Sequence, residues 1–266
     1  DRPNIMIKVP ATPEGIPAVR RLIGKGINVN VTLIFSLDAH RQVMEAYIAG
    51  LEDLAQAGGD LGGVSSVASF FVSRIDTAVD KLLNELTRQS ADGLEALMGK
   101  AAIANAKLAY QEFKRIFDGD RFAEMRSRGA RLQRPLWGST GTKNPAYSDV
   151  RYLDSLIGPN TVNTVPEATL MAFVDHGRSA QTLDQDVQDA EKVIQALQGA
   201  GISLDQVTTK LLADGVSAFA TSYDELLAGI EDKAESLLSR EHQHVDASTS
   251  ADSAQARSTG QIDTAG

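Results

Sequence analysis

The sequence predicts an α/β protein in which parallel strands alternate with longer helices. Short apolar runs rich in β-branched residues recur along the chain, and such runs are typical of buried strands. Most of them are followed by segments whose apolar residues recur every three to four positions, which is typical of helices packed on a sheet. The strands expected on this basis are residues 5–9, 27–34, 64–71, 134–138 and 161–165.

The first predicted strand contains Lys8. A strand buried on both faces rarely carries an ammonium group, because removing an unpaired charge from water is costly. A desolvated lysine loses its proton readily and can then act as a neutral amine nucleophile. The alternative is that Lys8 ends an edge strand with its ammonium group in water, and for a lone lysine this alternative stays open.

A turn and a helix follow the lysine strand. Thr12 is expected to cap the helix, which ends near Gly24. On the next strand Asn30 and Thr32 lie two residues apart, so their side chains point to the same side. A lysine on one strand and an Asn/Thr pair on the next predict a set of polar groups inside a barrel of parallel strands.

Three stretches resemble one enzyme family in the order that the family has them. Residues 7–36, "IKVPATPEGIPAVRRLIGKGINVNVTLIFS", closely resemble the active-site signature of transaldolase. "SVASFFVSRID" resembles the following strand, and "RPLWGSTGTKNPAYSDVRYLDSLIGPNTVNTVPEATLMAFVDHG" resembles the next two strands in one bacterial branch of the family. The resemblance runs from the first residue to about residue 240.

The resemblance implies a role for each polar residue. Lys8 would form a Schiff base with the ketose donor, Asn30 would bond its hydroxyl groups, and Thr32 would position a water that shuttles protons. The residues implied for substrate and phosphate binding are Ser69, Arg74, Ser139 and Lys143. From the residues alone the alternatives are structural: Asn30 and Thr32 could satisfy each other, and Arg74 could pair with Asp76.

The implied fold is a (β/α)8 TIM barrel of the class I aldolase type, with active-site groups at the C-terminal ends of the strands. The implied activity is transfer of a dihydroxyacetone unit from sedoheptulose 7-phosphate to glyceraldehyde 3-phosphate, in the non-oxidative pentose phosphate pathway, without a cofactor. One alternative is a fructose 6-phosphate aldolase that releases free dihydroxyacetone. Another is a chain with an intact lysine but no catalysis.

Five predicted strands are three fewer than such a barrel needs. The lysine strand is the fourth strand of the family, so we expect an N-terminally truncated chain that lacks the first three βα units. An Asp and a Glu that the family uses in proton transfer would be lost with them. We also expect this chain to be marginally stable or prone to aggregate, because an incomplete barrel leaves strand edges open.

Composition excludes several functional classes. The formal net charge of −9 argues against nonspecific binding of nucleic acid. The absence of cysteine excludes disulfides and thiol catalysis in this chain. The four histidines are scattered and suggest no metal site, and no apolar stretch approaches the roughly 20 residues of a membrane span. Together with these exclusions, the resemblance implies a cytoplasmic enzyme whose partners are sugar phosphates.

The expected domain division places the partial barrel in residues 1–240 and a disordered tail or linker in residues 241–266. The second segment has few large apolar residues and cannot bury enough surface to offset the entropy of ordering. Because some bacterial relatives are fused to glucose-6-phosphate isomerase, a fused isomerase domain is one expected partner, and a homo-oligomer is another. The expected helices after the first are residues 38–56, 76–86, 94–117, 150–156, 166–174, 183–199, 204–212 and 218–238.

Overall fold

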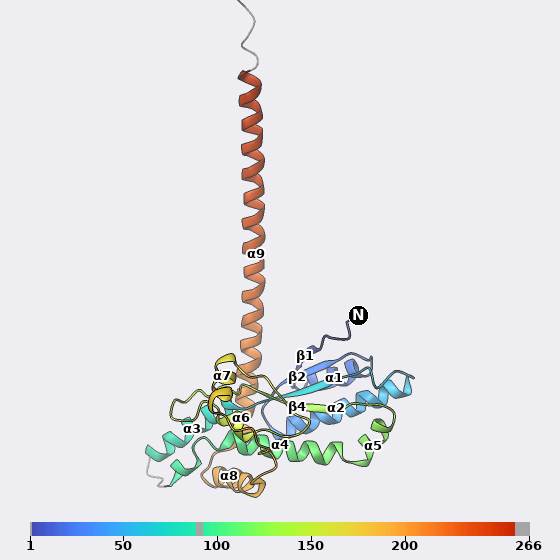
Figure 1. Cartoon of the computed structure of the whole chain (residues 1–266), viewed down its shortest axis with the longest axis vertical. Helices are drawn as coiled ribbons and strands as arrows, with labels where there is room; N and C mark the ends of the chain where they lie inside the picture. The colour runs from blue at the N-terminus through green and yellow to red at the C-terminus, as the bar shows by residue number, and fades with distance from the viewer. Residues whose placement is uncertain (1, 89–92, 259–266) are drawn as a thin grey trace, which may run out of the picture. The chain divides into compact units, whose positions relative to one another are not determined.

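The computed structural model describes residues 2–88 and 93–258, and for residues 238–258 it describes the backbone alone. Its centre is a sheet of five parallel strands in the order β1-β2-β3-β4-β5 (Figure 1). The strands are β1 (Ile7–Pro10), β2 (Val29–Ile34), β3 (Ser66–Phe71), β4 (Gln133–Gly138) and β5 (Val162–Asn163). Each overlaps one of the five strands that the sequence predicts, so the parallel α/β class is confirmed.

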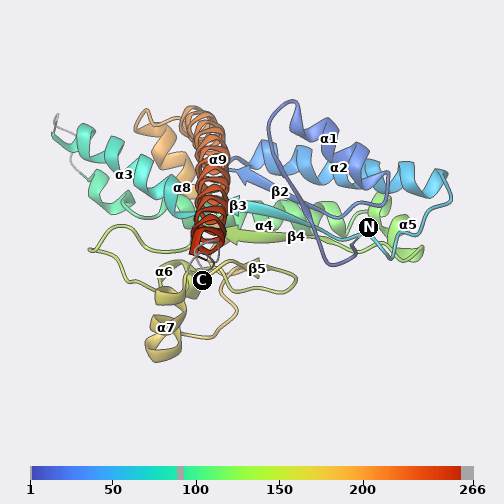
Figure 2. The same cartoon turned by 90° about the horizontal axis from the view of Figure 1, so that it is seen from above.

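Helices connect the strands and pack against one another. They are α1 (Gly15–Ile23), α2 (Leu37–Gln56), α3 (Ser73–Arg88), the short 3-10 helix η1 (Leu94–Leu97), α4 (Ala101–Phe117), α5 (Asp120–Ser127), α6 (Arg151–Ser155), α7 (Glu167–His176), α8 (Val187–Gly199) and α9 (Leu204–Ser258). Helix α1 packs on α2, α2 packs on α4, and α4 packs on α8. Figure 2 shows α2 and α4 running along the strands.

Two helical predictions differ from the structure. The expected helix 94–117 is divided into η1 and α4, because Gly99 has a φ of 66° and interrupts the helix between them. The expected helices 204–212 and 218–238 are one continuous helix, α9. Helix α5 was not expected from the sequence.

Short polar caps define the turns that leave β1 and β2. The Thr12 hydroxyl accepts a hydrogen bond from the Gly15 backbone N–H at 3.0 Å, as the sequence predicts. Ser36 accepts one from the Ala39 N–H at 3.1 Å, at the start of α2. A Cβ at Gly15 would lie 1.9 Å from the carbonyl oxygen of Pro10, so the tight turn after β1 requires glycine.

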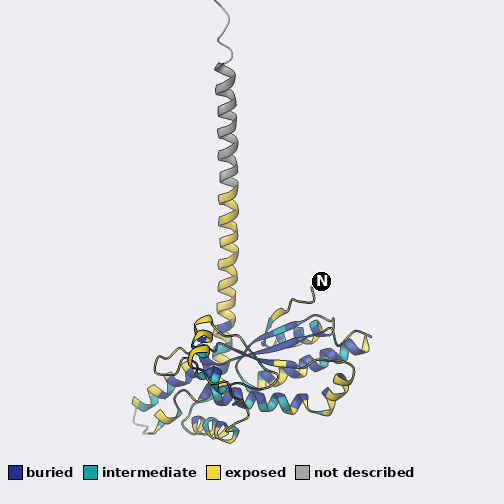
Figure 3. Cartoon of the chain, viewed as in Figure 1, coloured by how far each residue is buried: buried dark blue, intermediate teal, exposed yellow. Residues whose placement is uncertain are grey.

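The core lies between the sheet and helices α1, α2, α4 and α5, where most residues are buried (Figure 3). Val29 and Val31 of β2 are fully buried, and Phe70 of β3 meets Trp137 of β4 edge to face at 6.1 Å between ring centroids. Aromatic and β-branched residues therefore fill the face of the central strands that the helices cover.

Strand β1 departs from the prediction of a buried strand. Ile7 is 48% exposed, and Lys8 is exposed as well. The reason is topological: β1 is at the end of the strand order and, among the described residues, pairs only with β2. The environment of Lys8 thus matches the edge-strand alternative more closely than the desolvated one.

The chain divides into two compact units, residues 1–216 and 217–266. In the second unit the helix of residues 217–237 is largely exposed. The backbone is helical as far as Ser258, consistent with the absence of Gly and Pro between residues 230 and 259, and the expected disordered tail or linker from residue 241 stays a prediction. Residues 259–266 lie outside the described residues, and the domain division at residue 240 stays a prediction.

None of the described helices combines the length and the apolar composition that crossing a bilayer requires.

Candidate active site

The first part of the site lies on three adjacent strands. Lys8 of β1 pairs in register with Asn30 of β2. The Ser69 hydroxyl of β3 donates a hydrogen bond to the side-chain oxygen of Asn30 at 2.7 Å. Register partners on neighbouring strands project to the same face. Lys8, Asn30 and Ser69 therefore share one face of the sheet, and the structure brings together three residues that the sequence predicts.

Thr32 adds a hydroxyl to the same face, two residues after Asn30. It is buried, and its Oγ1 has no hydrogen-bond partner within the described part of the chain. Buried polar groups are normally paired. Asn30 bonds Ser69 rather than Thr32, so the structural alternative in which Asn30 and Thr32 satisfy each other is wrong. A hydroxyl that can both donate and accept suits the handling of a substrate proton.

A backbone irregularity follows Thr32. Leu33 has a φ of 59°, and the pairing of β2 with β3 shifts register between Val31 and Ile34. A bulky residue in the left-handed region is strained and tends to occur at functional sites. The sequence gives no signal for this feature, because Leu33 lies within an ordinary apolar run.

The second part of the site joins the ends of β3 and β4. The Ser73 N–H donates to the Ser139 carbonyl at 2.9 Å, and the two hydroxyl oxygens are also 2.9 Å apart. Arg74 follows in the first turn of α3, with its guanidinium 5.1 Å from the ring centroid of Phe71. Sequence reasoning missed Ser73, for which the only signal is its position between a predicted strand and a helix.

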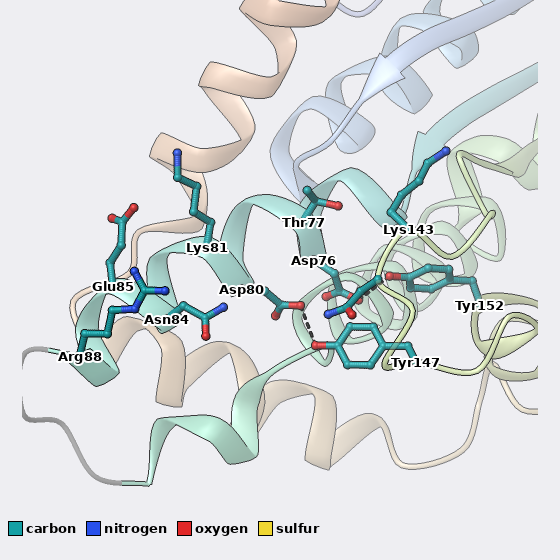
Figure 4. A pocket seen from close by; sticks show the side chains of 11 residues that line it. Asp76, Thr77, Asp80, Lys81, Asn84, Glu85, Arg88, Lys143, Tyr147 and Tyr152 are labelled. Carbon is teal, nitrogen blue, oxygen red and sulfur yellow. Dashed lines mark hydrogen bonds between the residues drawn. The ribbon is translucent and has the colours of Figure 1, made fainter.

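Lys143 lies in the segment after β4 and is exposed. It lines a cavity of about 490 Å³ whose wall includes Asp76 and Asp80 of α3. Figure 4 shows the Lys143 ammonium group pointing away from these two carboxylates. Lys143 is therefore at the rim of the cavity.

Asp76 is not the partner of Arg74. Its carboxylate accepts hydrogen bonds from the Tyr152 hydroxyl at 2.8 Å and from the Ala102 N–H at 2.7 Å. The alternative in which Arg74 is neutralised by Asp76 is therefore wrong. Within the described part of the chain, the contact found for the Arg74 guanidinium is that with the Phe71 ring.

Two histidines lie in opposite environments: the ring nitrogens of His40 are buried without a hydrogen-bond partner among the described residues, whereas His176 is exposed. His40 is fully buried and meets Phe70 edge to face at 5.6 Å, and burial lowers its pKa to about 4. His176 ends α7, and its ring nitrogens lie 2.8 Å from Asp149 and 3.0 Å from Asp175. Hydrogen bonds to Asp149 and then Asp175 raise the pKa of His176.

Within residues 2–88 and 93–237, whose side chains the structure describes, no cluster of three His, Cys, Asp or Glu side chains could hold a metal ion. On the shared face of the sheet, the described site has a primary amine, an amide and small hydroxyls. It offers a guanidinium, an ammonium and two serine hydroxyls beyond the strand ends. Such a set can bind a hydroxylated carbonyl compound at one end and an anion at the other.

Comparison with known proteins identifies the family. The family model described as Transaldolase/Fructose-6-phosphate aldolase matches residues 1–230. A transaldolase of Saccharopolyspora erythraea is 50% identical over 235 residues, which cover 88% of this chain and 63% of that protein. A transaldolase of Mycolicibacterium smegmatis is 50% identical, with 85% of this chain and 61% of that protein covered. A transaldolase of Trichodesmium erythraeum is 47% identical, with 89% of this chain and 64% of that protein covered.

The chain thus spans less than two thirds of the length of these relatives. Its parallel strands and their helices fit the TIM-barrel-type aldolase fold of the family, which confirms the predicted fold class.

Proposed function

The chain belongs to the transaldolase/fructose-6-phosphate aldolase family, and from this premise we propose that it performs the Schiff-base chemistry of a transaldolase on Lys8. The Lys8 amine adds to the carbonyl carbon of a ketose phosphate and expels water, which gives an iminium. The iminium accepts the electron pair of the breaking carbon–carbon bond, so that an aldose phosphate leaves and an enamine remains. The enamine then attacks the aldehyde of a second aldose phosphate, and water releases the new ketose.

The observation that carries this proposal is the shared sheet face of Lys8, Asn30 and Ser69. The register pairing of Lys8 with Asn30 and the 2.7 Å bond between Asn30 and Ser69 place an amide and a hydroxyl beside the lysine strand. These groups suit the hydroxyls of the dihydroxyacetone unit. Thr32, whose buried hydroxyl has no hydrogen-bond partner among the described residues, suits the positioning of the water that moves protons.

Arg74, Ser139 and Lys143 are the proposed binding groups for the substrate phosphate. Arg74 can grip phosphate oxygens through two parallel N–H bonds, whereas Lys143 acts as a point charge. Ser139 is fixed beside the first turn of α3 by its bonds to Ser73. The N-terminus of this 16-residue helix adds backbone N–H groups and a favourable dipole for an anion.

The proposed donor is sedoheptulose 7-phosphate and the proposed acceptor is glyceraldehyde 3-phosphate, in the pentose phosphate pathway of the cytoplasm. A second candidate is aldol cleavage of fructose 6-phosphate with release of dihydroxyacetone, because the matching family model names both activities. A fused isomerase domain or a homo-oligomer stays a prediction.

Borohydride trapping tests the proposal. The chain is incubated with fructose 6-phosphate, reduced with borohydride, and analysed by intact and peptide mass spectrometry. The expected result is a reduced adduct on the peptide that contains Lys8. The matched control is sorbitol 6-phosphate, which has the phosphate but no carbonyl group and should give no adduct.

The same experiment is made on a longer version, extended with the part of the Saccharopolyspora erythraea relative that lies outside the match. An adduct on Lys8 in the longer version alone would support the chemistry and show that the additional part completes the site. Adducts on other lysines only, or none in either version, would overturn the proposal. Thin-layer separation of the released sugars distinguishes transfer from release of dihydroxyacetone.

A further inference from the structure

Two tyrosines bond two aspartates of α3 at the side of the cavity behind Lys143. The Tyr152 hydroxyl donates to Asp76 at 2.8 Å, and the Tyr147 hydroxyl donates to Asp80 at 2.7 Å (Figure 4). Asp76 and Asp80 are four residues apart on α3, so their side chains lie on the same helix face. We call these four residues the tyrosine clasp.

The second oxygen of each carboxylate bonds a third segment of the chain. Asp76 accepts the Ala102 N–H at 2.7 Å, and Asp80 accepts the Gly99 N–H at 2.8 Å. Each aspartate therefore links α3 both to the entry of α4 and to the segment after β4. Buried carboxylates are tolerated only when they are well bonded, and Asp76 and Asp80 are 2% and 7% exposed.

Gly99 and Arg151 complete the surroundings of Tyr147. The Arg151 guanidinium lies 4.7 Å from the Tyr147 ring centroid and donates to the Gly99 carbonyl. A Cβ at Gly99 would meet the Tyr147 ring at 2.7 Å, and its φ of 66° is one that glycine favours. The close approach of the ring thus depends on glycine at this position.

The clasp joins the two elements that carry the proposed phosphate ligands. Arg74 lies two residues before Asp76 on α3, and Ser139 and Lys143 lie in the segment that Tyr147 and Tyr152 tie down. Between Ser139 and Tyr147 that segment has no regular helix or strand. Its placement relative to Arg74 depends on the bonds at its two ends, to Ser73 and to the aspartates, and on the bond of the buried Thr140 hydroxyl to Asn163.

We propose that Asp76 and Asp80, acting through Tyr152 and Tyr147, are positioning residues that hold Lys143 and Ser139 beside Arg74 and thereby set the affinity for the substrate phosphate. This inference rests on the proposed function of the site. It assigns to the clasp an effect on the phosphate end of the substrate and none on the carbonyl end, where Lys8 reacts. A clasp that only stabilised the fold would affect both ends alike.

The test compares a phosphorylated with an unphosphorylated ketose. Tyr147→Phe and Tyr152→Phe each remove one hydroxyl and keep the ring. The rate of borohydride trapping on Lys8 is measured against concentration for fructose 6-phosphate and for dihydroxyacetone. In each variant the half-saturating concentration of fructose 6-phosphate should rise about five- to tenfold, the effect of one lost hydrogen bond. The maximal rate, and the half-saturating concentration of dihydroxyacetone, should not change.

Tyr110→Phe is the matched control, because its hydroxyl bonds the Pro159 carbonyl at 3.1 Å and does not take part in the clasp. It should leave both substrates unaffected. An equal loss with both substrates in the clasp variants would show that the clasp only supports the fold. Unchanged half-saturating concentrations of both substrates in these variants would show that the clasp does not position the phosphate ligands. Either outcome overturns the inference.

Binding of inorganic phosphate separates this inference from the proposed function. It is followed by broadening of the ³¹P resonance, which needs no reaction at Lys8. If the wild type gives no adduct with any ketose, weaker phosphate binding in Tyr147→Phe and Tyr152→Phe, but not in Tyr110→Phe, would still support the clasp. Equal phosphate binding in all of them, or none in the wild type, would overturn it.

Discussion

Strand β1 and the tyrosine clasp both place ionisable groups on the sheet scaffold, but in opposite environments. Lys8 is exposed on an edge strand, whereas Asp76 and Asp80 are buried and each accepts two hydrogen bonds. In the proposed function Lys8 must meet a substrate, so its amine needs access. The aspartates hold three segments together, so their oxygens need partners and exclusion from water. In the proposed function the reactive residue and the positioning residues therefore differ in burial.

The largest expected effect is that of removing the Lys8 amine. Lys8→Met should abolish the borohydride adduct with fructose 6-phosphate, because no other amine replaces the nucleophile. It should change the free energy of unfolding by no more than about 0.5 kcal/mol, as is usual for exposed positions. Urea unfolding and trapping on the same preparations check both values.

Lys25→Met is the control, since Lys25 is also exposed and lies at the end of α1. It should keep both the adduct and the stability. A Lys8→Met protein that loses several kcal/mol of stability would show that the lysine supports the fold, and the contrast with the clasp would then fail.

A second prediction concerns pH and sharpens the contrast between buried groups. Burial raises the pKa of Asp76 from 3.8 to about 6 and lowers the pKa of His40 from 6.5 to about 4. The stability linked to Asp76 is fully present below pH 3.8 and is lost as the pH rises through 6. The stability linked to His40 is present above pH 6.5 and is lost as the pH falls through 4. The two effects oppose each other over the same range.

Single substitutions should separate the pH dependence of stability that is due to Asp76 from that due to His40. On acidification from pH 6.5 to 4, the free energy of unfolding of Asp76→Asn should fall by about 2 to 3 kcal/mol more than that of the wild type. The reason is that only the His40 effect remains in this variant. His40→Leu should show the opposite difference. Urea midpoints across this range measure both. Difference curves that are flat for both variants would show that neither group titrates with a shifted pKa.

The sequence predicts much of the lysine end of the site and little of the clasp. Parallel strands in chain order place Lys8, Asn30 and Ser69 on neighbouring strands, and period-2 alternation then gives their common face. The clasp joins residues near 76, 99 and 152, and which distant side chains meet is decided by tertiary packing. The exposure of β1 was missed for a related reason: an apolar run predicts a strand, but burial depends on what lies beside it.

The smallest expected effect compares two register partners, Ile7 of β1 and Val29 of β2. Val29 is 0% exposed and Ile7 is 48% exposed. Val29→Ala should therefore destabilise the protein by about 2 kcal/mol, and Ile7→Ala by about 1 kcal/mol or less, although the isoleucine side chain loses one methylene more. Urea unfolding measures both. A greater loss at Ile7 would mean that this face of β1 is covered in solution by another segment or a second copy, whereas Lys8 points to the opposite face.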